Sequence, residues 1–112
     1  MSLVHQVEQA THAWAAKGNK AGRARQRRMM YRFASHAEAH GARDKGQIGG
    51  RVVISFWKAL RAEKGLSWAT QMDYWRALRE LWPLLGLSGE VPAPRNPAPS
   101  PSEEQPAGGA AP

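Results

Sequence analysis

Apolar side chains recur along residues 1–87 every three or four positions, the spacing of a helix that buries one face. The first run covers residues 3–16 and stops at Gly18. The second covers residues 21–40 and stops at Gly41, since glycine commonly ends a helix. The inward positions are Leu3, Val7, Ala10 and Trp14 in the first run, and Gln26, Met30, Phe33 and Ala37 in the second.

Two further runs complete the pattern. The third covers residues 48–64, ended by Gly65, although its "RVVISFW" core is β-branched and could form a strand if taken alone. The fourth begins near Ser67, a good N-cap residue; we expect Pro83 to disturb its last turn and Gly86 to close it. The expected inward positions are Val52, Phe56 and Leu60 or Trp57, then Met72, Trp75, Leu78, Trp82 and Leu85. No alternating run long enough for a sheet occurs elsewhere, so the pattern predicts a small all-α bundle of four helices.

The pattern changes from residue 88 onward. Seven of the eight prolines lie at or beyond Pro92, and this stretch holds no aromatic residue and one large aliphatic residue, Val91. Such a segment cannot bury enough apolar surface to offset its ordering entropy. We therefore expect a folded domain over residues 1–87 and a disordered Pro-rich tail over residues 88–112, partly extended like polyproline.

Charge divides the chain at the same point. Residues 1–87 hold 15 Lys and Arg against six Asp and Glu, a net of +9, while residues 88–112 hold one Arg against three Glu, a net of −2. A body this basic favours a polyanionic partner, nucleic acid first and an acidic membrane surface second. There is no cysteine, no membrane-spanning run and no apolar centre of a signal peptide, so we expect a soluble, cytoplasmic protein.

The basic residues concentrate between Asn19 and Arg32, where no acid occurs. Arg25, Arg28 and Arg32 are spaced i, i+3, i+7 and form one stripe, roughly a third of a turn from the apolar face of the predicted helix. Like charges at this spacing cost a few tenths of a kcal/mol per pair, and a purely solubilising surface would interleave Glu. The stripe therefore favours a bound polyanion over a solvated face. The first turns of the same predicted helix carry three further cations, Lys20, Arg23 and Arg27. The positive end of the helix dipole lies there as well, so this arrangement suits a bound phosphate.

The last two predicted helices carry a family resemblance. An apolar helix is followed by Lys-Gly-Leu-Ser-x-x-Thr at residues 64–70 and by Tyr-x-x-Ala-Leu-x-x-Leu at residues 74–81. This order resembles the core-binding domain of tyrosine recombinases and phage integrases, over about residues 3–87. The resemblance implies a SAM-like four-helix fold that binds double-stranded DNA.

The sequence also departs from that family. The family often opens its second helix with Thr and places Tyr four residues later, where this chain has Arg25 and Met29. The Arg, His, Arg and Tyr constellation needed for recombination lies on a separate domain after this module, and only the tail follows Leu87 here. The resemblance therefore implies a DNA-binding module without strand-transfer chemistry, from a mobile genetic element and standing alone.

Members of this family contact duplex DNA through their second and fourth helices. Carried over by position, the candidates are Lys20, Arg23, Arg25, Arg27, Arg28 and Arg32 on the second helix, and Ser67, Thr70, Gln71, Arg76 and Arg79 on the fourth. Lys and Arg would contact phosphates without reading sequence. The Gln71 amide could pair with adenine in the major groove, or be an ordinary exposed helix residue. A small module contacts few base pairs, so self-association on DNA or a protein partner is plausible.

Enzymatic and metal-binding interpretations find little support. His36 and His40 are spaced i, i+4, but two ligands are too few and no Cys or carboxylate pair completes a zinc set. The "GQIGG" stretch lacks the features of a phosphate loop. We expect neither catalysis nor a cofactor. An alternative function is a basic protein–protein adaptor with a flexible Pro-rich arm; a membrane-surface role is disfavoured because packing leaves the second helix no wide apolar face.

Overall fold

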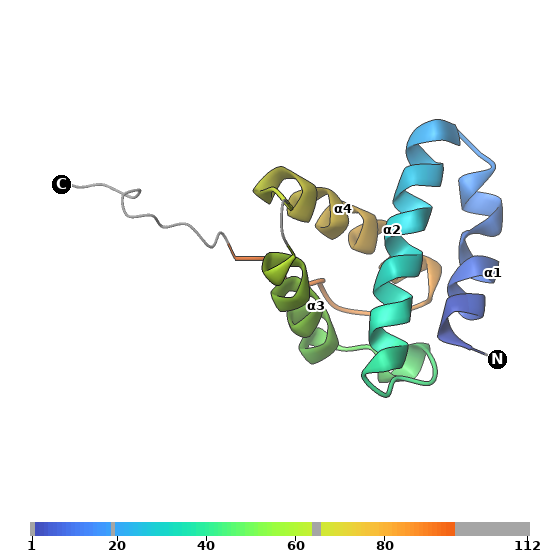
Figure 1. The fold of residues 1–112 in the computed structure, drawn as a ribbon. Coiled ribbons are helices and arrows are strands. Elements are labelled where there is room, and N and C mark those ends of the chain that lie inside the picture. The colour runs from blue at the N-terminus through green and yellow to red at the C-terminus, as the bar shows by residue number, and fades with distance from the viewer. Residues whose placement is uncertain (1, 19, 64–65, 96–112) are drawn as a thin grey trace.

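The computed structural model describes residues 2–18, 20–63 and 66–95, and over these ranges the chain contains helices and no strand (Figure 1). The helices are α1 (Leu3–Ala15), α2 (Lys20–Ala39), α3 (Gly50–Ala62) and α4 (Trp68–Leu84), with a short 3-10 helix, η1 (Lys45–Gln47), before α3. The predicted all-α, four-helix class is therefore confirmed. The β-branched "RVVISFW" stretch lies entirely within α3.

The helices α1 and α2 form an antiparallel pair, and α4 runs across that pair (Figure 1). The turns that end α1 and α2 contain Gly18 and Gly41, whose φ angles of 64° and 96° lie in the left-handed region that glycine adopts without strain. The core lies where the helices meet. Phe33 of α2 packs edge-on against Phe56 of α3 at 5.3 Å between ring centroids, and Phe56 packs against Tyr74 of α4 at 5.6 Å.

The buried faces of α1 and α2 agree with the predicted ones at Leu3, Val7, Met30, Phe33 and Ala37. The two later helices bury most of the predicted positions, including Leu78, Trp82 and Leu85 of the α4 region, and differ at a few. In α3 the fully buried valine is Val53 rather than Val52, although Phe56, Trp57 and Leu60 lie inward as expected. In α4 the buried set is Gln71, Tyr74, Ala77, Leu78, Leu81 and Trp82, whereas Met72 and Trp75 are half-buried.

The end of α4 tolerates its proline. Pro83 lies inside the helix, which continues to Leu84. Pro83 has no N–H to donate, but Leu85 N donates to Leu81 O at 3.0 Å and Leu87 N donates to Trp82 O at 3.0 Å, so the last turn stays closed. Gly86 follows with a φ of 75°, which confirms that the helix ends there.

Residues 88–95 pack against the folded body, and we call them the C-terminal strap. The Val91 side chain is 6% exposed, and Pro94 is also buried. Trp57 Nε1 donates to Pro92 O at 2.8 Å, and Trp75 Nε1 donates to Val91 O at 3.1 Å. The domain boundary predicted at residue 87 is therefore too early, because one aliphatic side chain and two indole donors hold the strap. The rest of the tail predicted to be disordered, residues 96–112, lies outside the described residues.

Candidate nucleic-acid interface

The two helices that were expected to hold DNA meet along one surface, where Asp73 of α4 joins them. Arg25 Nη2 of α2 lies 3.2 Å from Asp73 Oδ2, and Arg76 Nη1 of α4 lies 3.1 Å from Asp73 Oδ1. The carboxylate therefore fixes two guanidinium groups from different helices beside each other. Both arginines remain largely exposed, so their remaining N–H donors face solvent.

Arg32 extends this surface towards the end of α3. Its Nη1 donates to the Tyr74 hydroxyl at 3.1 Å, and its Nη2 forms an ion pair with Glu63. The hydrogen bond with Glu63 is the main cause that raises the pKa of Arg32 above its ordinary value, and partial burial opposes it. Arg32 therefore ties α2 to both α3 and α4, besides adding positive charge.

Lys20 and Arg28 are exposed, and the side chain of neither forms an ion pair or hydrogen bond with another described residue. Arg28 lies one turn from Arg25 and one turn from Arg32 on the same side of α2. We define the α2–α4 face as Arg25, Arg28, Arg32, Glu63, Asp73 and Arg76. Four cations against two acids leave it a net charge of +2. Lys20 is spaced i, i+3, i+7 with Arg23 and Arg27, so it lies on their stripe of α2 and not on this face. Glu80 lies two turns beyond Asp73, so the positive surface covers only the first half of α4.

Two of the predicted phosphate ligands point to the other side of α2. Arg27 Nε donates to Thr11 Oγ1 at 2.8 Å and Arg27 Nη2 donates to Glu8 O at 2.8 Å. Arg23 Nη1 donates to Trp14 O at 2.6 Å, with its guanidinium 4.8 Å from the centroid of the Trp14 ring. These side chains hold α1 against α2. The arginines of α2 thus lie on two surfaces, and helical spacing alone did not show which of the two packs against α1.

The first turn of α4 has no acid and contains the polar residues Thr70 and Gln71. Ser67 caps the helix, because its Oγ accepts a hydrogen bond from Thr70 N at 3.1 Å; Ser67 Oγ and Thr70 Oγ1 also lie 3.0 Å apart. Gln71, one residue further, is only 2% exposed and its Oε1 has no hydrogen-bond partner within the described structure. The prediction that Gln71 reaches a base edge is not compatible with this burial.

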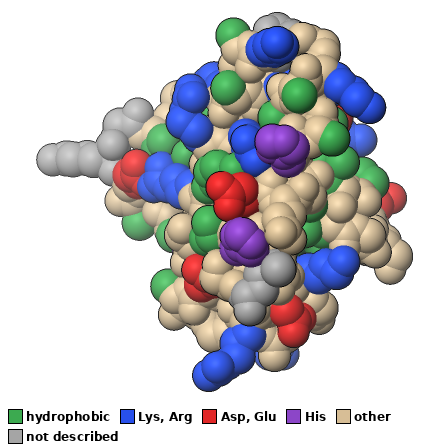
Figure 2. All heavy atoms as spheres, turned by 90° about the vertical axis from the view of Figure 1, so that its right-hand side faces the viewer, with side chains coloured by type: hydrophobic (Ala, Val, Ile, Leu, Met, Phe, Trp, Pro, Cys, Tyr) green, Lys and Arg blue, Asp and Glu red, His purple; other side chains and the backbone are tan. Residues whose placement is uncertain are grey.

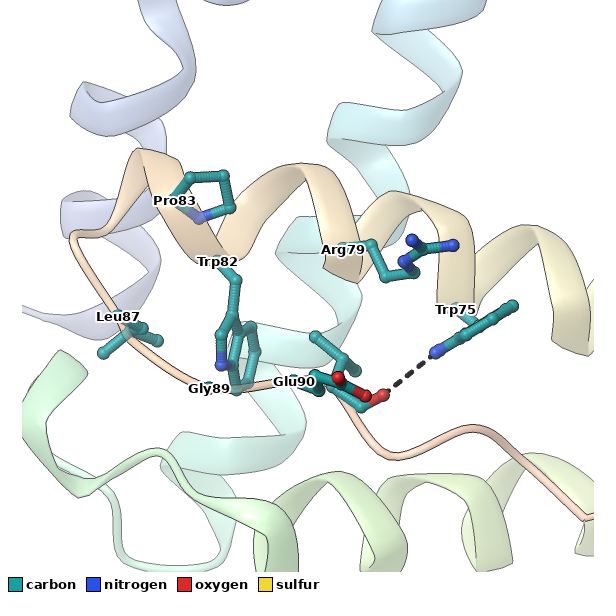
Figure 3. A pocket seen from close by; sticks show the side chains of 8 residues that line it. Trp75, Arg79, Trp82, Pro83, Leu87, Gly89 and Glu90 are labelled. Carbon is teal, nitrogen blue, oxygen red and sulfur yellow. Dashed lines mark hydrogen bonds between the residues drawn. The ribbon is translucent and has the colours of Figure 1, made fainter.

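Arg79 lies one turn beyond Arg76 on α4, but its guanidinium is directed to Trp75 instead of Asp73. Its guanidinium lies 4.8 Å from the centroid of the Trp75 ring, and it lines a hollow with Trp82, Pro83 and Glu90 (Figure 3). The strap forms one wall of this hollow, through the hydrogen bond from Trp75 to Val91. Arg79 is therefore separate from the α2–α4 face.

The α1 side of the molecule has a different charge pattern. Figure 2 shows basic, acidic and histidine side chains interspersed there. His5 Nδ1 lies 3.3 Å from Glu8 Oε1, which is one such mixed pair. On this side acidic and histidine side chains therefore lie among the basic ones.

The predicted histidine pair lies between α2 and α3. The rings of His36 and His40 stack with centroids 4.1 Å apart, and His36 Nε2 lies 2.8 Å from Ser55 Oγ. Burial, followed by the charge of His40, lowers the pKa of His36 below its ordinary value of 6.5. Over the described ranges, no group of three or more His, Cys, Asp or Glu side chains is placed to hold a metal ion.

No helix within the described ranges is long and apolar enough to cross a membrane. Comparisons with protein-family models, with curated proteins and with solved structures gave no match. A proposal for the function of this chain therefore rests on the geometry and charge of the α2–α4 face.

Proposed function

We propose that the protein is a non-catalytic module that binds double-stranded DNA through the α2–α4 face. The observation that carries this proposal is the joining of Arg25 and Arg76, from two helices, around Asp73. Arginines fixed in this way present their free N–H groups as a preorganised set, which lowers the entropy lost when phosphates bind. Arg28, which has no described partner, adds charge that no internal contact requires.

The contacts proposed here are made to the DNA backbone. Arginine and lysine neutralise phosphates and release counterions, which gives affinity that falls steeply with salt and is independent of sequence. Ser67 and Thr70 at the start of α4 can add neutral donors to the same backbone. Because Gln71 is buried, base reading is assigned to no residue.

The resemblance to the core-binding domain of tyrosine recombinases is part of the same proposal. It is supported by the position of the cationic surface, which lies on the second and fourth helices as the resemblance implies. In that setting the protein would act in the cytoplasm on the DNA of a mobile genetic element, binding without strand transfer.

The proposal is tested by fluorescence anisotropy of the full-length chain with a labelled random-sequence duplex, titrated at several salt concentrations. We expect a Kd between about 1 and 100 μM near physiological salt and a steep loss of affinity as salt rises. The variant Arg28→Ala removes one cation of this face without breaking a described contact. It should reduce the slope of log K against log salt by about 1, since each phosphate contact contributes about 0.9.

A matched control removes one cation elsewhere. Arg43 is exposed near η1, beyond the far end of α2, so Arg43→Ala makes the same change in net charge. It should retain most of the affinity and the slope. If the folded wild-type chain does not bind at low salt, the DNA proposal is wrong. If Arg28→Ala and Arg43→Ala lose affinity equally, the α2–α4 face is not the binding surface.

A further inference from the structure

The outward side of α3 carries an apolar residue among cations. Ile54, Lys58 and Arg61 are spaced i, i+4, i+7, so they form one stripe along the helix. Phe56 and Leu60 are buried on the opposite side. Ile54 is 47% exposed and is the large hydrophobic side chain that the described structure leaves in solvent.

The C-terminal strap completes a hollow over this stripe. Pro92, Ala93 and Arg95 lie beside Trp57 and the stripe, and together they enclose about 430 Å³. The strap is fixed in place by the hydrogen bond from Trp57 Nε1 to Pro92 O at 2.8 Å. The floor is apolar, while Lys58, Arg61 and Arg95 supply three positive charges and no lining residue is acidic. We call this hollow the α3–strap groove.

We propose that the α3–strap groove binds an acidic segment of a partner protein that carries a large apolar side chain to cover Ile54. Charge complementarity selects the partner, because three cations without a described ion pair attract carboxylates. The apolar floor selects against a ligand that is only charged, because covering Ile54 and Trp57 requires an apolar group. This inference is independent of the DNA proposal, since the groove and the α2–α4 face share no residue.

Other occupants fit this groove less well. A nucleic acid would satisfy the three cations, but its phosphates gain nothing from Ile54. A second copy of the same groove would bring like charges together. The chain's own residues 96–112 contain Glu103 and Glu104 but no large aliphatic or aromatic side chain, so they cannot cover Ile54.

The test uses two fluorescein-labelled 14-residue peptides and the full-length chain. The first peptide contains Glu and Asp around one Leu and one Phe, and the second has Ser in place of both apolar residues. We expect the first peptide to bind at least about fivefold more tightly than the second, the gain for covering a half-exposed isoleucine. The variant Ile54→Ser should remove this difference between the peptides. The variant Lys58→Glu/Arg61→Glu should lose binding of both peptides by tenfold or more.

Controls separate the occupants and the two proposals. Arg43→Glu/Lys45→Glu changes the net charge equally and should lose at most a few-fold in peptide affinity. Ile54→Ser should leave duplex binding unchanged, whether or not the DNA proposal holds. Equal affinity for the two peptides, or no effect of Ile54→Ser, would contradict the proposal. A duplex that displaces the peptide at equal affinity would assign the groove to nucleic acid. Tighter peptide binding to Glu103→Ala/Glu104→Ala would assign it to the tail.

Discussion

At the scale of single residues, Arg27 and Arg28 are neighbours in the sequence with different surroundings. Arg27 donates to Thr11 Oγ1 and Glu8 O, and the Thr11 hydroxyl, which is fully buried, donates in turn to Val7 O at 2.8 Å. Arg28 is exposed and has no described partner. The same residue type therefore stabilises the fold at one position and is available to a ligand at the next.

This difference predicts that alanine substitutions at Arg27 and Arg28 change the stability of the protein by different amounts. Arg27→Ala should lower the free energy of unfolding by about 1–2 kcal/mol, because it removes two charge-assisted hydrogen bonds that are partly screened by solvent. Arg28→Ala should change the free energy of unfolding by less than about 0.5 kcal/mol and weaken DNA binding. Urea denaturation followed by circular dichroism measures the free energy of unfolding of both variants. Equal destabilisation by the two variants would show that Arg27 does not tie α1 to α2.

Gln71 gives a second prediction at this scale. Its Oε1 is buried without a partner, and an unsatisfied buried acceptor costs about 1–3 kcal/mol. Gln71→Met keeps the length of the side chain and removes the polar atoms, so it should raise the free energy of unfolding by about 1 kcal/mol. Gln71→Ala, the control, should lower it because it leaves a cavity. A loss of stability in Gln71→Met would mean that the amide makes a favourable bond, for instance with a buried water.

At the scale of helices, the contact between α2 and α3 depends on an uncharged His36. The ring lies against Ser55 Oγ, the Phe56 ring and the stacked ring of His40, with no acid among these neighbours. Because the pKa of His36 is lowered in the folded state, the unfolded chain binds this proton more readily. The stability that depends on neutral His36 is full above a pH of about 6.5. It is lost as the pH falls below that value towards the lowered pKa.

Thermal unfolding between pH 7.5 and 5.0 should therefore show a midpoint that falls as the solution becomes more acidic. His36→Gln can keep a bond to Ser55 but cannot be protonated, so its midpoint should fall less over the same range. His12→Gln alters an exposed histidine of α1 and serves as the control, which should follow the wild-type curve. Parallel curves for wild type and His36→Gln would refute the assignment.

The helices themselves could be predicted from the sequence, but their surroundings could not. Apolar spacing and the glycines at positions 18, 41 and 86 located all four helices to within about two residues. The inward positions predicted for α4 included Leu78, Trp82 and Leu85 correctly but omitted Gln71 and Tyr74, whose side chains carry polar atoms. Spacing likewise placed the arginines on α2, but it does not show which side meets α1 or which acids of other helices lie near. Arg25 and Arg76 of the candidate site were identified, and the basic neighbours of Asp73 indicated an ion pair. That Asp73 joins two helices, and that Glu63 pairs with Arg32, could not be predicted.

At the scale of the whole molecule, composition misplaced the end of the folded body. The strap is rich in proline and has one large aliphatic residue, which is typical of a disordered tail. A segment this short needs few contacts to stay in place when its partners are already ordered. Trp57 and Trp75 each have one indole N–H that must be satisfied near the core, and the carbonyls of Pro92 and Val91 satisfy them. The tryptophans thus depend on the strap as much as the strap depends on them.

Two truncations test this mutual dependence. A chain that ends at Leu87 loses the burial of Val91 and leaves both indole donors without their carbonyls, so its free energy of unfolding should fall by about 2–3 kcal/mol. A chain that ends at Arg95 keeps every contact described for the strap and should unfold at the urea concentration of the full-length chain. Tryptophan fluorescence during the titration reports on all five tryptophans, Trp57 and Trp75 among them, and circular dichroism reports on the helices. If the Leu87 truncation is as stable as the Arg95 truncation, the strap is a passive cover, and the α3–strap groove would lose its fixed wall.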